Sequence, residues 1–218
     1  YEFAGPAIHE LSMEERMTIC NMSIEGGARC GYINPDEKTF SYIKNKLCAP
    51  KNEHWDKALR WWKSLKSDEN SIYDDVIKLD ASKVEPTVTW GITPGQSISI
   101  NQQIPLLDEL SPNDKLVAEE AYEYMSFKPG QLIKDTPVDV CFIGSCTNGR
   151  ISDLRVAAKV LKGKKVSKNV KAFAVPGSEK VATKAKQEGL DQIFKDSGFQ
   201  WREPGCSMCL AMNSDKLI

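Results

Sequence analysis

Three of the seven cysteines lie in glycine-rich segments where their spacing could serve chemistry. Cys206 and Cys209 are two residues apart in the segment PGCSMC (204–209), and Cys146 lies in the segment GSCTNG (144–149). Two sulfurs at this spacing can reach one ion or cluster, and neighbouring glycines let the backbone approach them closely. Thiolates are soft ligands that suit iron–sulfur clusters, zinc or copper(I). Spacing alone leaves three hypotheses open: a cluster or metal site, a redox dithiol, and unrelated buried thiols.

The segments that must position these cysteines alternate between apolar strands and helices. Strands are predicted at 138–143, 171–175 and 199–202, and helices at 151–161, 178–188 and 191–197. This alternation indicates parallel βαβ units, whose strands end at a shared carboxyl edge where open sheets bind ligands. Cys146 follows the first strand, while Cys206 and Cys209 follow the third. We therefore expect the three thiols at one edge of the sheet.

The chain before residue 130 is predicted to be mixed α/β. Helices are expected to begin at Ser12, Asn34 and Ser111, and short strands at 76–79 and 87–90. After the segment KPG (128–130), predicted strands and helices alternate along the chain. The sequence therefore predicts two domain portions, a mixed α/β portion at 1–130 and a parallel βαβ portion at 131–218.

The composition is that of an ordinary globular chain. With 41% hydrophobic and 27% charged residues among 218, it can bury a core and is not a disordered tail. The 29 basic and 30 acidic side chains nearly cancel, so neither nucleic acid nor an anionic membrane is an expected partner. The longest apolar runs, such as 138–144, are far shorter than the roughly 20 residues of a membrane helix.

The cysteine count also bears on the compartment. Seven is an odd number and too few for a small disulfide scaffold, which indicates a reducing compartment and hence the cytoplasm. The cysteines outside the two glycine-rich segments are predicted to be buried, inert thiols, because free cysteine packs as a small hydrophobe. They are Cys20, Cys30, Cys48 and Cys141.

A four-iron cluster held by three protein thiolates would have one iron without a protein sulfur. The open positions of that iron could bind a substrate hydroxyl and carboxylate and withdraw charge as a C–O bond breaks. Such chemistry belongs to a hydro-lyase rather than to an electron-transfer protein.

The two cysteine segments also carry a family resemblance. GSCTN (144–148) followed by GCSMC (205–209) resembles the cluster signature pair of the aconitase superfamily. The segments YEFAGPAI (1–8), VTWGITPGQ (88–96) and REPGCSMCLAMN (202–213) are similar to its bacterial isopropylmalate isomerase family, over essentially the whole length. The resemblance implies an α/β fold, with aconitase-like α/β/α domains and mainly parallel sheets.

The same resemblance implies a [4Fe-4S] cluster held by Cys146, Cys206 and Cys209. It implies a hydro-lyase of leucine biosynthesis, which interconverts the hydroxy-dicarboxylates 2- and 3-isopropylmalate through 2-isopropylmaleate. An aconitase or homoaconitase type of hydratase is the alternative within the enzyme class. Outside that class, a structural zinc module on the three cysteines remains open.

The segment ICNMSIE (19–25) resembles a family segment that supplies an Asn and a Glu near the open iron. Asn21 and Glu25 are four residues apart, so on a helix they would face the same way. The resemblance implies that both are catalytic residues, and the alternative is a solvated polar pair.

The family pattern is not complete in this chain. The N-terminal segment with further active-site residues and the substrate-binding segment after Cys209 have no counterpart here. In bacteria of this family a separate small subunit supplies another domain and forms a heterodimer with the large subunit. We therefore expect a piece of a larger polypeptide that is inactive alone and holds little or no cluster.

Overall fold

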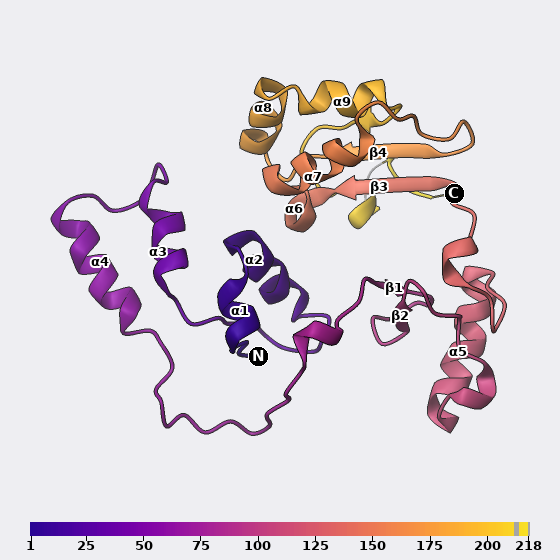
Figure 1. Ribbon diagram of the computed structural model, residues 1–218, viewed down its shortest axis with the longest axis horizontal. Coiled ribbons are helices and arrows are strands. Elements are labelled where there is room, and N and C mark those ends of the chain that lie inside the picture. The colour runs from indigo at the N-terminus through magenta and orange to yellow at the C-terminus, as the bar shows by residue number, and fades with distance from the viewer. Residues whose placement is uncertain (212–213, 218) are drawn as a thin grey trace. The chain divides into compact units, whose positions relative to one another are not determined.

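The computed structural model describes residues 1–211 and 214–217 of the chain (Figure 1). Its contacts divide into two units: Tyr1–Ser67 joins Val138–Ile218 in the first, and Asp68–Pro137 forms the second. Each unit has its own buried core. The domain boundary near residue 130 stays a prediction about the whole protein. No helix among the described residues is both long enough and apolar enough to cross a bilayer.

The first unit contains a three-stranded parallel sheet. Its order is β3 (Val140–Gly144), β4 (Lys171–Val175) and β5 (Gln200–Trp201). The register pairs Phe142 with Phe173, and Phe173 with Gln200. The predicted parallel sheet and α/β class are confirmed, although β5 is shorter than expected.

Helices α7 (Ile151–Leu161), α8 (Glu179–Gln187) and α9 (Leu190–Asp196) pack on this sheet (Figure 1, top). Small side chains on the central strand, Ala172 and Ala174, let the helices approach closely, and both are almost fully buried. The three predicted helices are confirmed to within one residue at each end. The sequence pattern was reliable here because each helix repeats its apolar residues every three to four positions.

The N-terminal part of this unit is helical. It contains α1 (Pro6–Glu10), α2 (Met13–Met22), α3 (Glu37–Lys44) and α4 (Glu53–Lys63). The predicted start of α2 at Ser12 is confirmed, because Ser12 and Glu15 form a capping box: the Ser12 amide donates to Glu15 Oε2 at 2.7 Å and the Glu15 amide donates to Ser12 Oγ at 3.3 Å. The predicted start of the next helix at Asn34 is wrong. Asp36 is its N-cap, since its carboxylate accepts from the amides of two following residues.

The second unit is built on a short antiparallel pair, β1 (Thr87–Thr89) and β2 (Ser97–Ser99), and on α5 (Pro112–Met125). Single 3₁₀ turns complete it: η1 (Ala81–Lys83), η2 (Leu107–Glu109) and η3 (Ile133–Asp135). The start of α5 at Ser111 is confirmed, because Ser111 Oγ accepts from the Asp114 amide. The strand predicted at 76–79 is wrong. That segment is exposed and pairs with no strand in the described chain, and an extended segment without a partner is not stable in water.

Candidate functional site

The loop that carries Cys146 begins where β3 ends, in the short helix α6 (Ser145–Asn148). Gly144 has φ +130°, and a Cβ there would lie 2.0 Å from the carbonyl oxygen of Val175 on the neighbouring strand. Ser145 follows with φ +65° and is buried. Only glycine fits at 144, and two successive positive φ angles turn the chain sharply, leaving the Cys146 thiol exposed.

Backbone contacts fasten this loop to the loop that follows β4. The Gly177 amide donates to the Gly149 carbonyl at 2.8 Å, and a Cβ on Gly149 would lie 2.6 Å from the carbonyl oxygen of Val175, the last residue of β4. Ser178, next along the chain, caps α8 by accepting from the Val181 amide at 3.3 Å. Backbone contacts therefore connect the carboxyl ends of β3 and β4, and the Ser178 hydroxyl is used as a helix cap.

Two arginines beyond this loop find partners inside the first unit. Arg150 Nη1 donates to the Glu14 carbonyl at 2.8 Å and to Thr18 Oγ1 at 2.9 Å, both on α2. Arg155 forms a two-pronged pair with the Glu188 carboxylate at 2.6 and 2.8 Å. The first arginine thus joins the Cys146 loop to α2, while the second pairs α7 with the end of α8. No spacing in the sequence signals the Arg150 contact, because its partners lie more than a hundred residues away.

The loop that carries the other two cysteines follows β5 and contains the turn η4 (Ser207–Cys209). Ser207 has φ +46° and is buried, while Cys206 and Cys209 are exposed. The carboxylate of Asp215 accepts from Arg202 Nη2 at 2.6 Å and from Ser207 Oγ at 2.8 Å. We call these three side chains the Asp215 clasp. The clasp joins Arg202, before the two cysteines, to Asp215, after them, and to Ser207 between them. The sequence did not predict it.

The three thiols suit a cluster in kind, and their common role as its ligands stays a prediction. All three are free and exposed, and they lie on loops at the carboxyl edge of one parallel sheet. Within residues 1–211 and 214–217, the structure does not gather three His, Cys, Asp or Glu side chains around one point for a metal ion. A four-iron cluster makes a different demand, since each of its cysteine ligands binds a different iron.

The remaining cysteines differ from the prediction in part. Cys30 and Cys48 are exposed, so their predicted burial is wrong. Cys20 and Cys141 are half-buried, and burial raises the pKa of both thiols. A raised pKa keeps a thiol protonated and unreactive at neutral pH, which agrees with the inert role expected of these two.

The predicted catalytic pair is placed differently from the expectation. Asn21 lies in the last turn of α2, but the helix ends at Met22 and Glu25 lies in the turn that follows. The Ser23 hydroxyl donates to the Cys20 carbonyl at 2.6 Å, and such side-chain bonds compete with helix continuation. The two side chains therefore do not share a helical face. Both are exposed, and their catalytic role stays a prediction.

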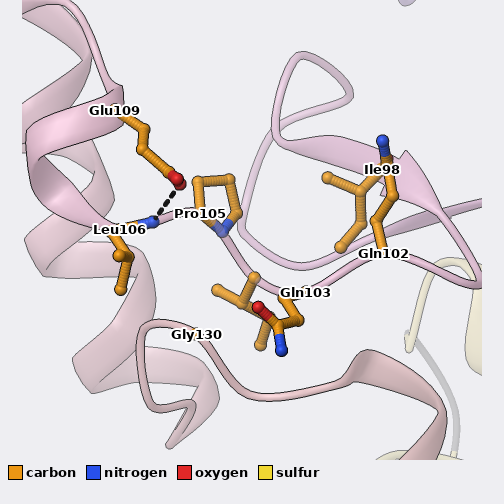
Figure 2. Close-up of a pocket in the computed structure, with 8 residues that line it drawn as sticks. Ile98, Gln102, Gln103, Pro105, Leu106, Glu109 and Gly130 are labelled. Carbon is orange, nitrogen blue, oxygen red and sulfur yellow. Dashed lines mark hydrogen bonds between the residues drawn. The ribbon is translucent and has the colours of Figure 1, made fainter.

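Neither of two cavities in the structure contains a predicted site residue. One of about 300 Å³ lies beside α2 in the first unit and is mostly apolar. The other, of about 330 Å³, lies in the second unit, where Glu109 turns back to accept from the Leu106 amide at 2.8 Å (Figure 2). The candidate site is thus the sheet edge with its exposed thiols.

Comparison with known proteins gives the family of the chain. The family model described as "Aconitase family (aconitate hydratase)" matches residues 1–218. The chain belongs to the aconitase family. A Prochlorococcus marinus (strain MIT 9215) protein named 3-isopropylmalate dehydratase large subunit is 94% identical over 218 residues, which are all of this chain and 47% of that protein.

More distant aconitase-family relatives carry the same name. The one from Nostoc punctiforme is 63% identical over 217 residues, and the one from Synechococcus sp. (strain CC9311) is 61% identical over 217 residues. Each match covers the whole of this chain and 46% of the relative. The chain therefore spans under half the length of the curated relatives it matches.

Proposed function

We propose that this chain is the cluster-binding part of a 3-isopropylmalate dehydratase large subunit. The observation that carries the proposal is the set of three exposed thiols on loops at one edge of the parallel sheet, in a chain of the aconitase family. The near-identical relative named for this enzyme supports the same conclusion.

Cys146, Cys206 and Cys209 would hold a [4Fe-4S] cluster, which supplies a Lewis acid for the loss and return of water. The protein's own part is to hold the two cysteine loops in place, through the backbone contacts at Gly149 and through the Asp215 clasp. The amide of Asn21 would orient a polar group of the substrate, and the Glu25 carboxylate would accept or return a proton.

The substrate would be a hydroxy-dicarboxylate, and the reaction would interconvert 2- and 3-isopropylmalate through 2-isopropylmaleate. The words "large subunit" in the relatives' names support a small subunit as the partner. The complete enzyme would act in the cytoplasm in leucine biosynthesis. The chain alone would be inactive and poor in cluster, because residues outside it complete the site.

Metal and sulfide analysis tests the cluster assignment. In the full-length protein, reconstituted anaerobically, we expect Cys146→Ser, Cys206→Ser and Cys209→Ser each to lose iron and sulfide while the fold survives. The exposed Cys48 lies outside the site, so Cys48→Ser is the matched control and should keep both. Stoichiometric zinc without sulfide in the wild-type protein would instead establish the structural zinc module.

An assay of the full-length chain with its small subunit tests the substrate. Isopropylmalate, citrate, homocitrate and citraconate should be compared in parallel. We expect turnover of isopropylmalate to be the fastest. Faster turnover of citrate or homocitrate would replace this proposal with an aconitase or homoaconitase type of hydratase.

A further inference from the structure

Arg150 connects two parts of the first unit that are far apart in the sequence. Its guanidinium is half-buried, and one nitrogen, Nη1, contacts both the Glu14 carbonyl and the Thr18 hydroxyl. Thr18 Oγ1 itself donates to the Glu14 carbonyl at 3.1 Å. The three groups form a closed triangle in which each contact fixes the other two.

The two segments that these contacts join, the loop before Arg150 and helix α2, carry residues of the candidate site. On one side, Arg150 directly follows Gly149, whose carbonyl is bonded to the loop after β4, and Cys146 lies four residues before Arg150. On the other side, Thr18 lies one turn before Asn21 on α2. A shift at Arg150 would therefore move the Cys146 loop and the Asn21 turn relative to each other.

Arginine suits this role better than lysine would. The planar guanidinium presents its donors in fixed directions, so two contacts to one nitrogen constrain the angle as well as the distance. Hydrogen bonds from a charged donor are also stronger than those from a neutral one. Arg155, five residues further along, differs from Arg150 because it contacts neither α2 nor the Cys146 loop in the described contacts. It pairs with the Glu188 carboxylate at the end of α8.

We propose that Arg150 is a positioning residue that holds α2, with Asn21, in register with the loop that carries Cys146. The effect of Arg150 on catalysis rests on the proposed function. Its role in fixing α2 relative to the Cys146 loop does not. Misplacing a reacting group by about 1 Å can cost about 100-fold in rate. The loss of Arg150 should therefore lower kcat strongly and leave KM little changed.

The test uses the full-length protein with its small subunit. We expect Arg150→Met to lower kcat about 10- to 100-fold with KM within about threefold, and Arg150→Lys to restore part of the loss. Thr18→Val, which removes the hydroxyl acceptor at nearly constant volume, should lower kcat less. Added to Arg150→Met it should cause little further loss, because both changes remove the bond between Arg150 Nη1 and Thr18 Oγ1. Arg155→Met is the matched control, and its kcat should stay within about twofold.

Hydrogen exchange supplies a readout that does not depend on activity. Arg150→Met should speed amide exchange both in the Cys146 loop and in the 19–25 segment, and Arg155→Met should speed neither. Unchanged exchange and unchanged kcat in both Arg150→Met and Thr18→Val would overturn the inference. If Arg150→Met fails to fold, Thr18→Val decides alone. If the wild-type enzyme does not turn over isopropylmalate, but Arg150→Met still speeds exchange in both segments, the proposed function is refuted and the positioning role is supported.

Discussion

The two cysteine loops are held at the sheet edge by different means. Backbone atoms hold the Cys146 loop, because Gly144 and Gly149 lie so close to neighbouring carbonyls that no side chain fits. Side chains hold the Cys206 loop through the Asp215 clasp, and a Cβ on Gly205 would meet nothing within 4 Å. The first loop is therefore preformed by the sheet itself. In the described part of the chain, side chains that meet at the Asp215 carboxylate hold the second loop, which should be the easier of the two to open.

The largest expected effect comes from making the same substitution in each loop. Gly144→Ala would force a Cβ to within 2.0 Å of a backbone oxygen at φ +130°. We expect it to lower the free energy of unfolding of the full-length protein by more than about 3 kcal/mol, or to prevent folding. Gly205→Ala is the control and should change it by less than about 1 kcal/mol. Urea unfolding measures both, and equal effects would show that the loops do not differ.

A smaller effect on the free energy of unfolding is expected at the ion pair between Arg16 and Asp36. This pair holds α2, the helix that Arg150 contacts. Arg16 on α2 is buried and forms two 2.8 Å bonds with Asp36, and these hold the pKa of that carboxyl at about 2, below its usual 3.8. Because the folded pKa is lowered, the stabilisation is fully present above about pH 4 and is lost as the pH falls toward 2. It amounts to about 2 kcal/mol.

Asp36→Asn should remove this stabilisation at neutral pH. Unfolding of the variant should then show less pH dependence than the wild type between pH 4 and pH 2, the window set by the two pKa values. Urea unfolding at several pH values measures the difference. The interpretation fails if the wild-type and variant curves stay parallel across that window.

The smallest effect on stability is expected at the clasp. Arg202 is partly exposed, so Asp215→Asn should cost about 1 kcal/mol or less. The same change should speed alkylation of Cys206 and Cys209 in the cluster-free protein, because it frees the turn at Ser207, and should leave Cys146 unchanged. Mass spectrometry of the alkylated peptides measures each rate. Equal acceleration at Cys146 would show that the two loops are not held independently.

Local signals in the sequence predicted the regular elements well. The capping box at Ser12 and the strands and helices of the parallel sheet follow from residue types within a few positions of each other. The errors arose where a more distant or competing contact decides the outcome. α2 ends at Met22, before Glu25, where the Ser23 hydroxyl bonds to the Cys20 carbonyl, and the 76–79 segment has no strand to pair with in the described part of the second unit.

The cysteines of the candidate site could be predicted from the sequence, but the contacts that hold their loops in place could not. The sequence placed three cysteines at the sheet edge because loops after parallel strands share that edge. It gave no sign of the Asp215 clasp or of the contact between Arg150 and Thr18, since no sequence period links these residues. It also could not foresee that Cys30 and Cys48 are exposed, because burial depends on what the rest of the chain covers.

The contact between Arg150 and Thr18 has a consequence for the order of folding. It closes 132 residues of chain, whereas the bond between Arg202 and Asp215 closes 13. The entropy of closing the longer loop is less favourable by about 2 kcal/mol, so the Cys206 loop should take shape early and α2 should dock late. Weakening the late contact should then speed unfolding and leave the rate of folding nearly unchanged.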